Sequence, residues 1–227
     1  MKNIYLSIVF ILTLLSSYSQ IEKGTKSIGI SFSSSQASNK SNSYVNGSYS
    51  NESNSNSIGA SSNFNYFIKN NLSIGCALEY TYSKGYNLYT YPMGETNSSS
   101  SVGNNFSTSF NSSYYFQLSE RFYFSITGSL IYGHSITNNT QIIETDAYSQ
   151  ETKTKEYSNL YSIRFNPSIM YFIRPKWGLK ASFGSLYYTV QNGRNIDLPY
   201  DNHNNRYSYG LNLSSNSFSF GINYYFK

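Results

Sequence analysis

Apolar and polar residues alternate along the last strand-length stretch of the chain. Phe218, Phe220, Ile222, Tyr224 and Phe226 occupy every second position, and Ser, Gly and Asn fill most of the positions between them. This period of two predicts a β-strand with one apolar face and one small, polar face. So many aromatic residues on one face are typical of a membrane barrel, in which the apolar face contacts lipid and the polar face lines the lumen.

The same alternation recurs along the chain and predicts eight strands. Their apolar faces are expected to begin near Ile28, Ile58, Leu72, Val102, Phe122, Tyr157, Trp177 and Tyr207. In the seventh strand, the positions assigned to lipid are Trp177, Leu179, Ala181, Phe183 and Tyr187. The fold class is therefore all-β, an eight-stranded antiparallel up-and-down transmembrane barrel.

Two strands are expected to be irregular. Pro167 lies on the lipid-facing parity of the sixth strand and has no N–H to donate to the ladder, so a local distortion is predicted there. In the last strand, the apolar positions change parity between Leu213 and Phe218. A parity change within one strand predicts a bulge or kink near Ser214–Ser217.

The segments between strands are short at one end and long at the other. Three junctions, at residues 65–72, 114–122 and 170–177, join an aromatic strand end to a tight polar turn and an apolar restart. Four longer polar stretches alternate with them and are predicted as extracellular loops: Ser33–Asn56, Gly85–Ser100, Ser135–Glu156 and Gln191–Asn205. Short periplasmic turns and long outer loops are the outer-membrane pattern, with both termini on the periplasmic side.

The N-terminus predicts export. A basic start at Lys2 precedes an apolar run from Ile4 to Leu15, and small residues follow at Ser17 and Ser19. This order indicates a signal peptide over residues 1–19, because the apolar run is far shorter than the ~20 residues of a spanning helix. Residues 20–227 are then one outer-membrane barrel domain, and the expected location is the cell outer membrane.

Composition supports a membrane barrel and excludes several other classes. The chain has 25 tyrosines, and tyrosine suits the girdles at which the ring meets lipid and the hydroxyl meets water. The net charge of +5 is mild and scattered, which argues against nucleic acid as a partner. The single cysteine, Cys76, excludes an internal disulfide and lies on an apolar face. No metal-ligand spacing or phosphate loop is present, so we expect no metal and no cofactor.

Three charged residues lie on the predicted lumen side of their strands. They are Glu79, Arg164 and Lys180, and the first two are near mid-height. Because an eight-stranded barrel is just wide enough for side chains to fill it, we expect Glu79 to pair with Arg164 and with Lys180. This lumen charge cluster is interpreted as part of a plug that satisfies the interior, and the alternative is a gate in a narrow pore.

Enzymatic chemistry has little support in the sequence. The two histidines are His134, at the outer end of the fifth strand, and His203, in the fourth loop near Asp201. Serine is so abundant that a serine near either histidine means little, and a catalytic triad is defined by geometry rather than spacing. Acidic residues in the third loop, at positions 146, 151 and 156, make a calcium site conceivable without supporting it. We therefore expect a protein that is not an enzyme.

The chain end resembles the C-terminal signal by which outer-membrane barrels are passed to their insertion machinery. The matching positions are Ser219, Gly221, Tyr224 and Phe226, and the departure is Lys227, since many such proteins end on the aromatic residue. With the signal peptide, strands and loops, the mature chain resembles the small OmpA/OmpX-like outer-membrane barrels, and its Asn, Ile, Lys, Ser and Tyr usage is similar to that of Bacteroidota members. The resemblance implies outer-membrane lipids and the barrel insertion machinery as partners.

Three functions remain as hypotheses. The first is a structural or surface-interaction barrel, whose Ser-, Asn- and Tyr-rich loops make an adaptable contact surface for an extracellular partner or glycan. The second is a narrow, porin-like pore for ions or small solutes, whose conductance would depend on Glu79. The third is a lipid-modifying enzyme of the outer leaflet, which would need His134 or His203 beside a serine and an acid.

Overall fold

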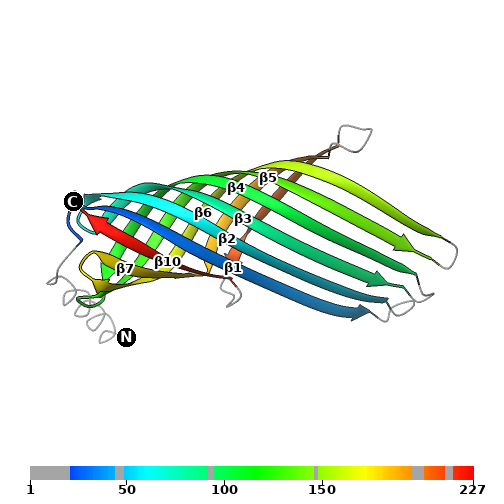
Figure 1. Ribbon diagram of the computed structural model, residues 1–227, viewed down its shortest axis with the longest axis horizontal. Coiled ribbons are helices and arrows are strands. Elements are labelled where there is room, and N and C mark those ends of the chain that lie inside the picture. The colour runs from blue at the N-terminus through cyan, green and yellow to red at the C-terminus, as the bar shows by residue number, and fades with distance from the viewer. Residues whose placement is uncertain (1–20, 44–48, 92–94, 146–147, 196–201, 213–216) are drawn as a thin grey trace, which may run out of the picture.

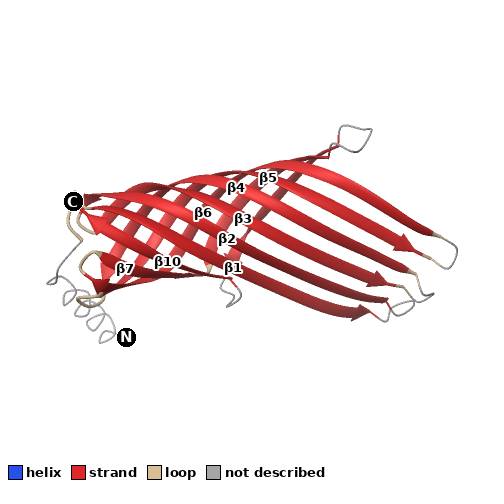
Figure 2. Cartoon of the chain, in the orientation of Figure 1, coloured by secondary structure: helices blue, strands red, loops and turns tan. Residues whose placement is uncertain are grey.

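A computed structural model describes residues 21–43, 49–91, 95–145, 148–195, 202–212 and 217–227. The described part is almost entirely strand (Figure 2). No helix within it is long and apolar enough to cross a membrane. The predicted signal peptide, residues 1–19, lies outside the described residues.

Ten strands make up the described part. They are β1 (Lys26–Ser43), β2 (Tyr49–Lys69), β3 (Leu72–Thr90), β4 (Thr96–Gln117), β5 (Phe122–Glu144), β6 (Ser149–Arg174), β7 (Trp177–Phe183), β8 (Ser185–Asn195), β9 (Asn202–Asn212) and β10 (Ser217–Phe226). All neighbouring strands are antiparallel, in the order β5-β4-β3-β2-β1-β10-β7-β6-β8-β9, and β5 also pairs with β6. That last pairing closes the ring (Figure 1).

The ring contains eight strand positions, because two of the predicted strands are interrupted. β7 and β8 together form the predicted seventh strand, and both pair with β6. β9 and β10 together form the predicted eighth, with β9 paired to β8 and β10 paired to β7 and β1. The eight-stranded antiparallel barrel predicted from the sequence is therefore confirmed.

Closing the ring offsets the strand register by ten residues. From Ile30 in β1, the row of paired residues runs through β2, β3, β4 and β5 to Tyr161 in β6. In the opposite direction, through β10 and β7, the same row reaches Tyr171. The offset between positions 161 and 171 is the shear of the barrel, and it requires strands that tilt strongly against the barrel axis.

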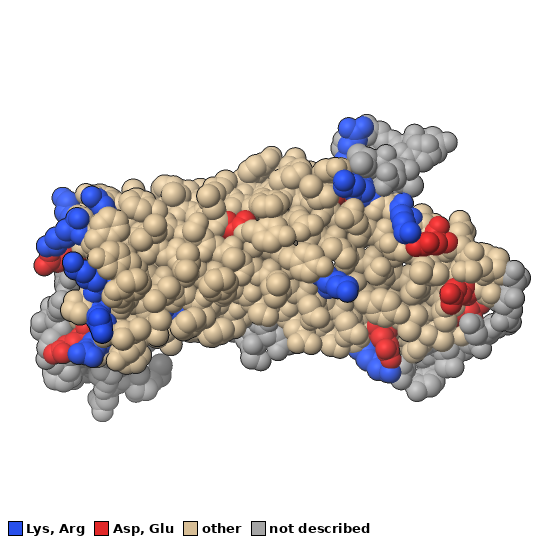
Figure 3. Space-filling model, viewed as in Figure 1, with Lys and Arg blue, Asp and Glu red and all other residues tan. Residues whose placement is uncertain are grey.

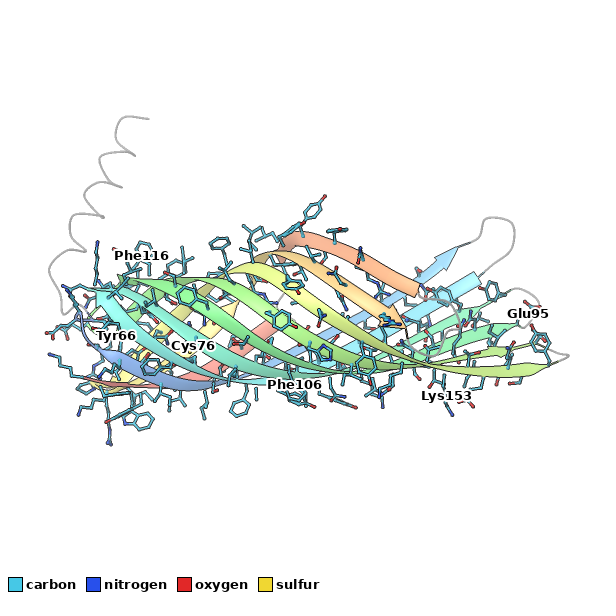
Figure 4. The ribbon with its side chains drawn as sticks, turned by 90° about the horizontal axis from the view of Figure 1, so that it is seen from above. Tyr66, Cys76, Glu95, Phe106, Phe116 and Lys153 are labelled. Carbon is cyan, nitrogen blue, oxygen red and sulfur yellow. The ribbon has the colours of Figure 1, made fainter. Side chains whose placement is uncertain are left out.

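The outer surface carries the predicted apolar belt. Side chains such as Ile28, Leu78 and Phe106 are 53%, 65% and 60% exposed because they point away from the lumen. Figure 4 shows Tyr66, Cys76, Phe106 and Phe116 on this outer face. On the face seen in Figure 3, charged residues of both signs gather at the end where the termini lie and toward the opposite end, and the broad band between is largely uncharged. This distribution is the one expected of a barrel wall in lipid.

Aromatic pairs mark the end of the belt near the termini. The rings of Trp177 and Tyr224 are 4.9 Å apart, and those of Phe122 and Tyr171 are 4.7 Å apart. Each pair joins two adjacent strands across the outer surface. Such cross-strand aromatic pairs stabilise the sheet and form the periplasmic girdle that the sequence predicts.

The predicted outer loops are largely strand. Residues assigned to the first three loops continue the ladders of the β1–β2, β3–β4 and β5–β6 hairpins, up to the pairs Ser43–Tyr49, Thr90–Thr96 and Glu144–Ser149. β6 alone has 26 residues, whereas a spanning strand needs ~9–11. The long outer segments are thus paired hairpins that exceed the length of a membrane span, and Figure 1 shows them as long strands at the end opposite the termini.

An irregularity is predicted at Pro167 of β6, and the structure has it in the neighbouring strand, between β7 and β8. β6 pairs with β7 as far as Ser168 and with β8 from Phe165, so two residues of β6 face the three residues 183–185. The extra residue is accommodated by Gly184, which has a φ of 69°, and its carbonyl accepts a hydrogen bond from the Asn166 amide at 3.1 Å. Proline cannot donate to this ladder, so the partner strand breaks at this level.

The bulge reverses the faces of the seventh strand, and one sequence assignment is wrong as a result. Tyr187 was expected to face lipid, but it lines the lumen, and Leu186 and Tyr188 are the exposed residues. The inserted residue at Gly184 shifts the alternation by one position. The parity change predicted near Ser214–Ser217 coincides with the interruption between β9 and β10, and residues 213–216 lie outside the described residues.

Candidate functional site: the barrel lumen

The lumen contains a polar cavity of about 690 Å³. Its wall consists mainly of the Ser, Thr and Asn residues on the inner parity of every strand, as the alternation predicts. Some of these groups pair with one another, such as Ser31 with Ser61 and Ser113 with Thr127, at 2.7 and 2.9 Å between hydroxyl oxygens. The polar side chains therefore line a space instead of filling it, which differs from the plug of polar and charged groups that the sequence predicts.

Glu79, Arg164 and Lys180 all line this cavity. The predicted ion pair is absent: across the described ranges, no oxygen of Glu79 lies within 4.0 Å of a nitrogen of Arg164 or Lys180. Glu79 instead accepts a hydrogen bond from the Thr81 hydroxyl at 3.3 Å, and the Lys180 ammonium donates to the Thr127 hydroxyl at 3.4 Å.

The register explains why these charges stay apart. Lys180 and Glu79 belong to one row of paired residues, and the row passes from β7 to β3 over Gly221, Ser31 and Ser61. Four strand steps in a ring of eight place the two residues on opposite walls. The three intervening residues are small, so the space between the walls stays open.

The two cations lie on one side of the lumen. Lys180 reaches Thr127 of β5, and Thr127 is paired in the ladder with Asn166 of β6. Arg164 is the next inward-facing residue of β6 toward the outer end. Arg164 and the ammonium of Lys180 therefore lie on the wall formed by β5, β6 and β7, and Glu79 lines the cavity from β3.

A cluster of large side chains closes the lumen near the termini. This floor is formed by Ile21, Phe67, Tyr115, Tyr123, Met170, Phe172 and Tyr225. Phe67 and Met170 are fully buried, and the Phe67 ring centroid lies 5.4 Å from that of Tyr115. The floor comes from β2, β4, β5, β6 and β10, with Ile21 before β1, and it lies between the polar cavity and the periplasmic end of the barrel.

This floor is not among the features predicted above, although the sequence contains a signal for it. Adjacent aromatic residues recur at the periplasmic strand ends, as in Tyr66-Phe67 and Tyr114-Tyr115-Phe116. Neighbouring residues in a strand point to opposite faces, so one member of each set must enter the lumen. The inward members, such as Phe67 and Tyr115, form the floor, and their neighbours on the outer face belong to the girdle.

The residues of the predicted insertion signal occupy two environments. Ser219 and Gly221 line the cavity, whereas Tyr224 packs on Trp177 at the outer surface. A Cβ on Gly221 would come within 2.7 Å of both the Ile30 carbonyl oxygen and the Ser31 Cβ, so glycine is required by close packing of β10 on β1. The role of Ser219, Gly221, Tyr224 and Phe226 in insertion stays a prediction.

The histidines give no hydrolytic site in the described residues. His134 lies on the outer face of β5, and its Nδ1 is 3.0 Å from the amide oxygen of Asn159, with no carboxylate partner in the described part. His203 lies in β9, and its side chain is outside the described residues. No group of three or more His, Cys, Asp or Glu residues in the described ranges could hold a metal ion.

Comparison with known proteins shows similarity in fold. No protein-family model matches the chain, and no curated protein matches it. Among solved structures, Ail, the attachment invasion locus protein of Yersinia pestis, is 14% identical over 90% of this chain and 99% of that chain, with a TM-score of 0.39. The outer membrane protein OprG from Pseudomonas aeruginosa is 10% identical over 90% and 97%, with a TM-score of 0.37.

A protease is also among the similar structures. The outer membrane protease OmpT from Escherichia coli is 11% identical over 93% of this chain and 97% of that chain, with a TM-score of 0.36. That the present chain is not an enzyme stays a prediction. The closed ring and the apolar outer belt are those of an outer-membrane β-barrel protein.

Proposed function

We propose that this outer-membrane barrel acts at the cell surface, where its long hairpins contact an extracellular partner or glycan, and that its lumen does not conduct. The observation that carries the proposal is the length of the paired hairpins beyond the apolar belt. The 26 residues of β6 extend roughly 85 Å along the strand at ~3.3 Å per residue, and the apolar band of such barrels is ~25 Å tall. Even with strong tilt, about half of this strand lies outside lipid.

The chemistry of these hairpins supports contact with other molecules. At their outer ends, β4 and β5 form Ser-, Asn- and Thr-rich ladders, and Tyr86, Tyr89 and Tyr148 are exposed nearby. Tyrosine with small polar residues makes an adaptable hydrogen-bonding surface. Pairing of the backbone holds this surface in place, so binding would sacrifice less conformational entropy than ordering a free loop.

The closed floor supports a lumen that does not conduct. An ion that passed through the barrel would have to displace the buried rings of Phe67, Tyr115 and Tyr225. The pore hypothesis is therefore less well supported than the surface role. Assignment to the Bacteroidota type rests on composition alone and is part of the same proposal.

Shortening one hairpin tests the surface role. Asn138 pairs with Lys155, so replacing residues 139–154 by Asn-Gly should close the β5–β6 hairpin with a two-residue turn and leave the membrane part intact. Cells that display the wild-type protein should attach to dextran-coated glass, and cells with the shortened variant should attach severalfold less. Glu120→Gln, in the periplasmic turn, serves as control and should behave as wild type. Equal attachment of wild-type and shortened proteins at equal surface levels would refute the role of this hairpin.

A further inference from the structure

The guanidinium of Arg164 has no partner among the residues that the structure describes. Across the residues that the structure describes, no hydrogen bond or ion pair engages it, although the side chain is partly buried in the lumen wall. A guanidinium carries five N–H donors in a planar fork that matches a carboxylate. Lys180, on the same wall, makes one weak hydrogen bond within the described part of the chain, to the Thr127 hydroxyl. Two cations with this much unused donor capacity indicate a site for an anion.

The cavity has the size and lining of a small-molecule site. Its volume of about 690 Å³ lies within the range of roughly 300–1,000 Å³ that holds small ligands. Hydroxyl and amide groups dominate the wall opposite and above the cations, including Ser107, Asn105 and Gln191. The side-chain oxygen of Asn105 is buried and has no hydrogen-bond partner in the described part of the chain. Such a wall suits a ligand that carries several hydroxyl groups.

We propose that the lumen binds a small hydroxylated carboxylic acid of sugar-acid size. Arg164 and Lys180 hold the carboxylate on the β5–β7 wall, and the Ser, Thr and Asn side chains bind the hydroxyl groups. Glu79, on the opposite wall, accepts hydroxyl hydrogens and repels a second negative charge. The floor of Phe67, Tyr115 and Tyr225 closes the site on the periplasmic side, so the ligand enters from outside.

This site is independent of the surface role of the hairpins. Arg164 and Lys180 lie within the membrane part of the barrel, and shortening the β5–β6 hairpin beyond residues 138 and 155 leaves both in place. Loss of surface attachment and loss of ligand binding can therefore be observed separately.

Isothermal titration of the refolded full-length protein in detergent micelles tests the site, with sodium glucuronate as the probe. Glucose and glucosamine are the neutral and cationic counterparts of similar size. We expect one glucuronate per chain, bound at least about tenfold more tightly than glucose and more tightly still than glucosamine. Arg164→Gln and Lys180→Gln should each weaken glucuronate binding about tenfold or more, since each removes a charge-assisted hydrogen bond.

Lys153→Gln is the matched control for charge. Lys153 is exposed on the outer part of β6 and lies 3.0 Å from Glu151, so its loss should leave glucuronate binding unchanged. Arg164→Lys keeps the charge and removes the fork, and should give intermediate affinity. Folding of each variant is checked by circular dichroism, and the milder lysine variant serves if the glutamine variant does not fold. Folded wild-type protein that binds no glucuronate, or folded Arg164 and Lys180 variants that bind it as wild type does, would overturn the proposal.

Discussion

The hydroxyl of Tyr225 donates a hydrogen bond to the sulfur of Met170 at 2.8 Å, across the floor of the barrel. Tyr225 is in β10 and Met170 is in β6, with β7 between them. Gly178 of β7 provides the room, because a Cβ there would lie 3.3 Å from the Tyr225 ring and 3.4 Å from the Met170 sulfur. This contact links the last strand to β6 across the end of β7.

Truncating the floor should destabilise the barrel. Met170 is fully buried, so Met170→Ala is expected to lower the free energy of unfolding by about 2–5 kcal/mol through lost packing and a residual cavity. Ile169→Ala, at the next position but facing lipid, should have a smaller effect because lipid fills the space. Denaturant unfolding of the refolded protein in lipid vesicles measures both. Equal losses for the two variants would show that the floor is not tightly packed.

Removing rings from the floor should also open the lumen. Wild-type protein is expected to be silent in single-channel recordings, and the double variant Phe67→Ala/Tyr115→Ala should conduct because both rings lie in the floor. The control, Tyr66→Ala/Tyr114→Ala, changes the same two strands one residue away on the outer face and should stay silent. Steady conductance of the wild-type protein would instead favour the pore hypothesis, and its response to Glu79→Ala would then locate the filter.

The break between β7 and β8 should depend on glycine. Gly184→Ala is expected to lower the free energy of unfolding by about 1–2 kcal/mol, because a φ of 69° is strained for a residue with a Cβ. Gly210→Ala is the control: its backbone is not left-handed, and its Cβ would meet Tyr187 at an ordinary 3.6 Å. Denaturant unfolding compares the two. An alanine at 184 as harmless as one at 210 would contradict the strained bulge.

Acidic pH should release the contact between the chain end and the segment before β1. A hydrogen bond and the charge of Lys227, whose nitrogen lies 2.6 Å from the carboxylate, hold the pKa of Glu22 below its usual value. A depressed pKa in the folded state means that the contact contributes above the pKa of the unfolded chain and is lost as pH falls through the lower, folded value. Carboxyl titration by NMR should show a higher pKa for Glu22 in Lys227→Gln than in the wild type or in Lys176→Gln. An unchanged pKa would exclude the contact in solution.

Cys76 should report contact with lipid. Its side chain is exposed on the outer face of β3, between Ile74 and Leu78 in the apolar belt. In vesicles, a lipid-soluble maleimide should label it and a membrane-impermeant one should not. In a Cys76→Ala background, Asn39→Cys on the outward β1–β2 hairpin should react with both reagents. Rapid labelling of Cys76 by the impermeant reagent would place this part of β3 outside lipid.

Local alternation was sufficient to predict the barrel from the sequence. A period of two assigns each residue to lipid or lumen without reference to distant strands, which is why residues such as Leu78, Phe106 and Glu79 were placed on the correct faces. The same logic located the distortion near Pro167. Alternation placed Tyr187 on the wrong face. A single extra residue at Gly184, in the same predicted strand and opposite Pro167 of β6, reverses every face beyond it.

The sequence by itself determined the fold class: an eight-stranded barrel with an apolar belt, a polar lumen and long polar outer segments. Only the tertiary structure decided how the lumen is occupied, because that depends on register and shear between strands far apart in the chain. These place Glu79 across the lumen from Lys180, with small residues between them, and bring Phe67, Met170 and Tyr225 together in one floor. Alternation predicts the face on which a side chain lies, and ring closure determines which residues it contacts.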